Sequence, residues 1–97
     1  MNRVALTAHI AEASALRYTP AGLPALDFRL EHESQVQEAG QARQVKAAIR
    51  AVAIGSLAET LARQPIGSRW TFTGFLATPR NGKHPVLHIQ TFEPDQI

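Results

Sequence analysis

The sequence predicts a single all-β domain, a five-stranded Greek-key barrel with one short helix between the third and fourth strands. Two observations lead to this prediction. Apolar and polar residues alternate in several short segments, and turn-forming proline and glycine residues separate those segments. The 97 residues suffice for one domain, which we assign to residues 1–97. A domain this small gains from a closed barrel or a dimer, because both cover apolar surface and strand edges.

The first two strands have the clearest pattern. Apolar and polar residues alternate over about residues 2–12 and again over about residues 25–33, so each strand is expected to bury one face. Two prolines and a glycine within residues 19–24 predict the turn that makes these strands a hairpin. Residues 34–42 are polar and contain one glycine, which predicts a loop.

A third strand is predicted over about residues 43–54. Its apolar phase changes near Ala51, which indicates a bulge or strong coiling of a long strand bent around a barrel. Ser56 is then expected to cap a short helix, with Glu59 three residues later as in a capping box. This helix is expected to end by Pro65.

The last two strands are predicted over about residues 69–77 and 86–93, with a bulge at Gly74. A short basic loop, residues 78–85, joins them around an Asn-Gly turn signal. The resulting order, β-β-β-α-β-β, is that of the OB-fold. In this barrel the face of strands 2 and 3, together with two loops, binds nucleic acid.

Several classes of function are excluded by what the sequence lacks. Without cysteine there is no disulfide and no cysteine-based zinc site, which fits a cytoplasmic protein. Thr7 and His9 interrupt the N-terminal apolar run, so no signal peptide is expected, and no apolar stretch is long enough for a membrane helix. No glycine-rich nucleotide motif or G-x-S-x-G motif occurs.

The groups of residues that contain histidine predict neither a metal site nor a catalytic site. His84 and His88 fall in a loop and a strand, so a shared metal is not expected. The residues of Glu31-His32-Glu33 should point to alternate faces of a strand and cannot converge on one group. We therefore expect no metal, no cofactor and no enzymatic activity.

Charge is distributed unevenly along the chain. Residues 41–90 contain seven basic residues and one acidic residue, a net charge of +6, whereas the remainder carries −4. One reading is a basic side that docks a polyanion in a fixed orientation. The other is that these charges only solvate the surface. Charge alone does not separate the two.

The basic residues nevertheless fall in two regions that flank one groove in an OB barrel. Lysine and arginine there would neutralise phosphates and release counterions. Arg43 ranks below the others because its strand phase matches the apolar face. The candidate nucleic-acid-binding residues are Arg17, Tyr18, Arg43, Lys46, Arg50, Arg80, Lys83 and His84.

Aromatic stacking platforms are scarce. Tyr18 is the best exposed candidate, although it could equally pack on the barrel rim. Trp70 shares the strand phase of Phe72, so we favour a core or dimer contact over base stacking. The phenylalanines are expected to be buried: Phe28, Phe72, Phe75 and Phe92.

Short motifs support one family when they are taken together and in order. They are Asn2-Arg3, Pro20, Gly22, Pro24, Leu30-Glu31-His32, Glu38-Ala39-Gly40, Arg43-Gln44, Gly67-Ser68-Arg69, Gly74-Phe75, Asn81-Gly82 and Val86-Leu87-His88. Over about residues 2–92 the chain resembles the primosomal replication protein N family, PriB. The resemblance implies a homodimeric OB-fold, related to bacterial single-stranded DNA-binding protein, that binds single-stranded DNA. It also implies partners in the replication-restart primosome, where such proteins bridge the restart helicase to loading of the replicative helicase.

The match to the family's DNA contacts is partial. Where the family has aromatic residues near the third strand, this chain has Gln41 and Lys46, and Glu33 stands at a basic position. Basic loop positions are kept at Arg17, Arg80 and Lys83. The resemblance therefore implies a groove that holds phosphates with little base stacking. DNA binding should be weaker and more salt-dependent than in the family at large.

The leading hypothesis is thus a single-stranded DNA-binding accessory protein of the primosome. The alternative is an OB-fold protein–protein adaptor with only weak nucleic-acid binding, which the scarce aromatic residues favour. RNA binding is a third option, because OB barrels serve both polymers. We also considered the first strand as a dimer edge.

We expect Lys46→Glu to weaken binding to oligo-dT by more than about tenfold, because it reverses a charge that should lie against phosphate. Fluorescence anisotropy measures the affinity, and circular dichroism checks that the fold is unchanged. An unchanged affinity would remove Lys46 from the site.

Overall fold

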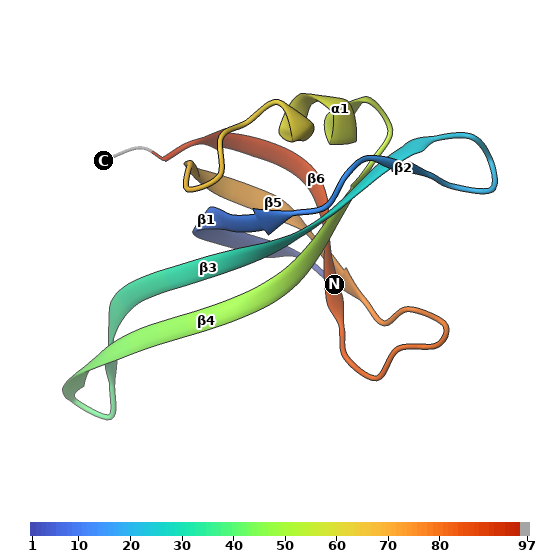
Figure 1. Cartoon of the computed structure of the whole chain (residues 1–97). Helices are drawn as coiled ribbons and strands as arrows, with labels where there is room; N and C mark the ends of the chain where they lie inside the picture. The colour runs from blue at the N-terminus through green and yellow to red at the C-terminus, as the bar shows by residue number, and fades with distance from the viewer. Residues whose placement is uncertain (96–97) are drawn as a thin grey trace.

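Five long strands close into a barrel in this computed structural model, which describes residues 1–95 (Figure 1). Around the barrel the order is β1, β3, β4, β6, β5 and back to β1. The β4–β6 pair is parallel, and the other pairs are antiparallel. This topology, with a helix between the third and fourth long strands, confirms the predicted OB-fold. The elements are β1 Val4–Ala13, β2 Arg17–Tyr18, β3 Pro24–Glu38, β4 Gln41–Ile54, α1 Ser56–Ala62, β5 Arg69–Ala77 and β6 Val86–Pro94.

Three of the predicted strands agree closely with the structure. The fourth long strand occupies the predicted residues, and the first and last differ at their ends by one or two residues. The two-residue β2 was not predicted. It pairs with the start of β3, Arg17 with Ala25 and Tyr18 with Pro24, and so extends the first hairpin beyond the barrel.

The predicted loop over residues 34–42 is wrong. β3 and β4 continue through it, paired without interruption as far as Glu38 and Gln41, and form an arm that projects from the barrel (Figure 1). Ala39 and Gly40 make the turn with φ of +52° and +78°, and positive φ at both central residues is typical of a type I′ hairpin. Both faces of the arm meet solvent, so its strands lack the apolar alternation that reveals a half-buried strand.

The start of the helix also differs from the prediction. Ser56 is the first helical residue and not the cap, and no side-chain capping bond forms, so the predicted capping box is wrong. Gly55 takes the cap position with φ of +88° and ψ of −153°, a conformation almost restricted to glycine. Its N–H donates to the carbonyl of Pro24 (2.8 Å), which ties the end of β4 to the start of β3. The helix ends at Ala62, before Pro65 as expected.

The predicted bulge at Gly74 is confirmed. The β5–β6 register shifts between Thr73 and Gly74, and the strands approach so closely there that a Cβ on Gly74 would lie 1.8 Å from the carbonyl oxygen of His88. The β3–β4 pairing passes Ala51 without a register shift, so β4 follows the barrel by curving (Figure 1). A further irregularity, between Ile10 and Glu12 of β1, was not predicted.

The core is apolar and lies inside the barrel beneath α1. Its largest fully buried side chains are Phe72, Leu30 and Leu87. Helix α1 contributes Ala58 and Leu61, which pack into the same cluster. Buried side chains alternate along β1, β6 and the middle of β3, as the sequence predicts for strands with one dry face, whereas Ala51, Val52 and Ala53 of β4 are all buried.

The aromatic residues follow the prediction except that Phe75 and Phe92, both predicted to be buried, are half-buried. Phe28 and Phe72 are buried, and the edge of Trp70 packs on Phe92 with ring centroids 4.9 Å apart. Trp70 also donates its indole N–H to Ser68 Oγ (2.9 Å) and packs against the core. Its strand phase in the sequence favoured such a packing role over base stacking. Phe75 was predicted to be buried, but it is half-buried and stacks on a histidine of the neighbouring strand.

We expect Gly55→Ala to lower the free energy of unfolding by about 1–3 kcal/mol, because alanine at this φ and ψ is strained. No atom lies within 4 Å of the added Cβ, so a clash does not contribute. Chemical denaturation measures the loss.

Ser56→Ala is the matched control, because the Ser56 side chain makes no capping bond. It should change the free energy of unfolding by less than about 0.5 kcal/mol. A larger loss for Ser56→Ala than for Gly55→Ala would restore the capping box.

Candidate nucleic-acid interface

The outer faces of β3 and β4 carry opposite charges side by side. Side chains alternate along a strand, so every second residue of the paired strands shares the outer face. Basic residues lie mainly on β4 and acidic residues mainly on β3. The outward residues are Lys46, Ala48 and Arg50 on β4 and, directly opposite them, Glu33, Glu31 and Arg29 on β3.

A hollow of about 410 Å³ separates β4 from the loop between β5 and β6. It brings together three of the predicted residues, Arg50 from β4 and Lys83 and His84 from the loop. We call this hollow the cationic trough. Its other lining residues are Ala48, Ile49, Pro79, Gly82, Pro85 and Val86.

The cationic trough continues past Arg50 into a second hollow of about 520 Å³. The two hollows share Arg50, Pro79 and Val86. The second one reaches the end of β1 and the outer face of β3, where Arg29 is located. Arg50 therefore lies at the junction of the two hollows, with solvent on both sides.

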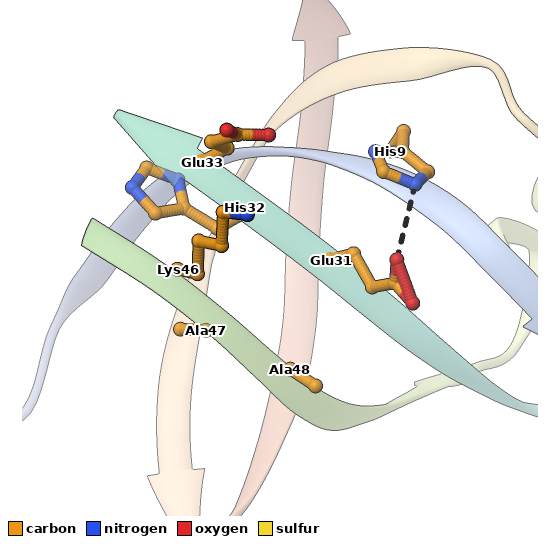
Figure 2. A pocket seen from close by; sticks show the side chains of 7 residues that line it. All are labelled: His9, Glu31, His32, Glu33, Lys46, Ala47 and Ala48. Atoms are coloured by element: carbon orange, nitrogen blue, oxygen red, sulfur yellow. Dashed lines mark ion pairs between the residues drawn. The ribbon is translucent and has the colours of Figure 1, made fainter. Parts of the chain in front are cut away.

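Lys46 lies in a third hollow, of about 330 Å³, which shares Ala48 with the cationic trough (Figure 2). The carboxylates of Glu31 and Glu33 line the same hollow. The sequence prediction grouped Lys46 with Arg50 and the loop cations. It noted Glu33 at a position that is basic in the family, and the structure shows that Glu31 and Glu33 both line the hollow of Lys46.

Those carboxylates are engaged by other side chains. Glu31 accepts a hydrogen bond from Arg29 (2.6 Å) and lies 3.5 Å from His9 Nε2 (Figure 2), and Glu33 accepts one from Gln44. Lys46 has no ion pair within residues 1–95. Its ammonium group is therefore free to meet a ligand.

His32 borders this hollow but is a structural residue. Its Nδ1 lies 2.6 Å from the carbonyl oxygen of Thr7 and its Nε2 lies 2.8 Å from Ser34 Oγ. With both ring nitrogens bonded, His32 ties β3 to β1 and shares no proton with its two glutamate neighbours. Among the described residues there is no group of three or more histidine, aspartate or glutamate residues that could hold a metal ion.

Two of the predicted phosphate ligands are already paired. Arg17 donates two hydrogen bonds to Asp27 (2.6 and 3.0 Å), and Arg43 pairs with Glu38 (2.6 Å) at the tip of the arm. The hydrogen bond from Arg17 to Asp27 raises the pKa of Arg17 above its ordinary value. A phosphate that approaches either arginine meets a positive charge that a carboxylate already compensates.

The remaining predicted residues are accessible. Arg80 is exposed in the β5–β6 loop beside Pro79 and has no ion pair in the part of the chain that the structure describes. Tyr18 is 69% exposed on β2, so it does not pack on the barrel rim and can offer its ring to a ligand. Within residues 1–95, three cations without an ion pair line the hollows, namely Lys46, Arg50 and Lys83, and a fourth, Arg80, follows the lining residue Pro79 in the loop.

The basic segment of the sequence does not form one patch. Arg69 pairs with Asp95 (2.6 Å), and Arg43 is neutralised on the arm. Sequence reasoning also missed Arg29, which lies directly opposite Arg50 and pairs with Glu12 (3.1 Å) as well as Glu31. The alternation of β3 placed Arg29 on the charged face, but only the strand register shows which cation it opposes.

Comparison with known proteins agrees with this geometry. A family model described as "Another single-strand binding protein family" matches residues 2–91. The replication restart protein PriB of Bordetella pertussis is 50% identical over 91 residues, covering 93% of this chain and 85% of that protein. The chain belongs to the PriB family. This membership confirms the resemblance seen in the sequence and the prediction that the chain is not an enzyme.

Other PriB proteins and solved structures agree. PriB of Nitrosomonas europaea is 39% identical over 90 residues, covering 92% of this chain and 83% of that protein. A crystal structure of PriB from Ralstonia solanacearum has a TM-score of 0.90 at 38% identity and covers 99% of both chains. A crystal structure of a deletion mutant of the single-stranded DNA binding protein from Thermus aquaticus has a TM-score of 0.76 at 25% identity, covering 99% of this chain and 51% of that one.

We expect Arg50→Gln to weaken oligo-dT binding about fivefold at 0.1 M salt, the loss for one phosphate contact on a single strand. The slope of log K against log salt should become shallower by about 0.7. The matched control is Arg17→Gln combined with Asp27→Asn, because it removes the guanidinium together with the carboxylate that neutralises it. Equal losses for the two variants would contradict the distinction between free and paired arginines.

Proposed function

We propose that this chain is a single-stranded DNA-binding accessory protein of the replication-restart primosome, and that it holds the phosphate backbone along the cationic trough. The observation that carries the proposal is the meeting of unpaired Arg50 with Lys83 and His84 in one open hollow of the OB groove. The relatives support it, since the curated ones are replication restart proteins and the family is described by single-strand binding.

Charge favours one path for the strand. Along β3 the outer face presents Glu31 and Glu33, whereas β4 and the β5–β6 loop present free cations. A phosphate backbone is repelled by the first and attracted by the second. We therefore place the strand along β4 and the loop, from the cationic trough toward Lys46.

The mode of binding follows from the side chains available. A cluster of lysine and arginine residues binds phosphates without reading sequence, and such binding weakens as salt rises. A lysine replaces the aromatic contact of the family at Lys46, so electrostatic contacts carry more of the affinity. Tyr18 of β2, between β1 and β3, can add a stacking contact with a base.

We further propose that the protein works as a homodimer in the cytoplasm. β1 closes the barrel through its C-terminal half, from His9 to Ala13, where it pairs with β3. In the part of the chain that the structure describes, Val4–Ala8 form a strand ladder with β5 alone, and His32 already bonds the Thr7 carbonyl on the other edge. The edge of Val4–Leu6 can therefore pair with a second copy. No helix within residues 1–95 has the length and apolar character needed to cross a membrane.

The partners in restart are proposed by family membership. We expect the chain to contact the restart helicase and the proteins that load the replicative helicase. The arm and the β2 hairpin both project from the barrel (Figure 1) and are accessible to such proteins.

A salt titration tests the proposed function. Binding of the full chain to oligo-dT should fall with a slope of about −3 for each protomer, if all four free cations contact phosphates. Anisotropy gives the affinity, and sedimentation in the same buffer gives the stoichiometry. Absence of binding even below physiological salt would favour the adaptor alternative, and preference for an RNA strand of the same sequence would favour RNA.

A further inference from the structure

Phe75 and His88 form a ring pair on the outside of the barrel. Their rings are nearly parallel, with an angle of 10° and centroids 4.9 Å apart, and both residues are half-buried. The flanking residues of β6, Leu87 and Ile89, point into the core at 0% and 5% exposure. Because side chains alternate along a strand, His88 and its partner Phe75 point outward.

The position of this ring pair is fixed by the backbone. At Gly74 the two strands approach too closely for any side chain, and the register shift just before it sets Phe75 opposite His88. Phe75 is not among the partly buried side chains that pack against the core. Core packing therefore does not account for a phenylalanine at this place.

The ring pair adjoins the cationic trough. His88 pairs with Val52 of β4, and Arg50 is two residues before Val52 on the same face. Val86, two residues before His88 on its face, lines the cationic trough together with Arg50. Two residues along a strand span about 7 Å, so the rings are one row of side chains away from Arg50.

We propose that the Phe75–His88 ring pair is a stacking platform for a nucleobase of the single strand whose phosphates lie along Arg50 and Lys83. This inference rests on the proposed function and adds base contacts to it. Flat aromatic faces beside cations are what a nucleotide requires, since the base stacks and its phosphate is neutralised. The platform supplies the stacking contact that the chain lacks at Lys46.

The experiment compares two probes of equal length, oligo-dT and an abasic deoxyribose-phosphate oligomer. Phe75→Leu keeps an apolar side chain but removes the ring. It should lower the affinity of the full chain for oligo-dT by between about fivefold and about 150-fold, the loss of one base stack. Affinity for the abasic oligomer and the salt slope should not change.

Phe92→Leu is the matched control. Phe92 is also a half-buried ring in the β5–β6 sheet, but it packs on Trp70 and the core. Its loss should lower stability and leave the affinity of the folded protein for oligo-dT unchanged. Equal weakening of oligo-dT binding by both variants would show that the effect is structural and would overturn the platform.

A second measurement on the unmodified protein does not depend on the folding of a variant. Ring-proton resonances of Phe75 and His88 should shift on addition of oligo-dT and remain in place with the abasic oligomer. Equal shifts with both probes, or none with oligo-dT, would overturn the proposal. If oligo-dT binds and Arg50→Gln weakens it while Phe75→Leu does not, the platform is wrong and the proposed function stands. If neither probe binds, both proposals fail.

Discussion

The parallel pairing of β4 with β6 is the contact on which the rest of the arrangement depends. It joins Ala51 to Leu87 and Val52 to His88, and it closes a barrel whose other strands pair antiparallel. The pairing sets the β5–β6 loop beside the middle of β4, so Arg50 meets the loop cations. It also places His88 beside β4, so the ring pair and the cationic trough become neighbours.

Charge compensation then decides which cations face solvent unpaired. Arg29 is opposite Arg50, and two like charges so placed are unfavourable unless one is neutralised. Glu12 and Glu31 neutralise Arg29, and the hydrogen bond that Arg29 donates to Glu31 is the main cause that raises the pKa of Arg29. Arg50 is left without a carboxylate partner among residues 1–95. Gln44 donates a hydrogen bond to Glu33, and within residues 1–95 Lys46 forms no ion pair with the carboxylate opposite it. The acidic residues of β3 thus neutralise Arg29 and repel a polyanion. The favourable path for a polyanion therefore lies along β4 and the loop.

Local patterns predicted the barrel well where one face of a strand is dry. β5 agrees with its predicted residues, and the bulge at Gly74 was visible as a glycine inside an alternating segment. The pattern failed where both faces are wet, as in the arm over residues 34–42, because alternation reports burial and not pairing. It also failed for Phe75, since a phenylalanine in a strand usually marks the core. Here the register of β5 against β6 places the Phe75 side chain on the outer face of the barrel, opposite His88.

The sequence by itself determined the order of the five long strands, the dry face of β1, of the barrel part of β3 and of β6, and the types of residue near the groove. These properties depend on neighbours along the chain, through alternation and backbone preference. The tertiary structure decided which cations meet and which are neutralised. Arg50 and Lys83 line one hollow although they are on different segments. The pairing of Arg17 with Asp27 and the stacking of Phe75 on His88 are contacts between separate strands. Such contacts follow from strand register and barrel closure, which a pattern of neighbouring residues does not report.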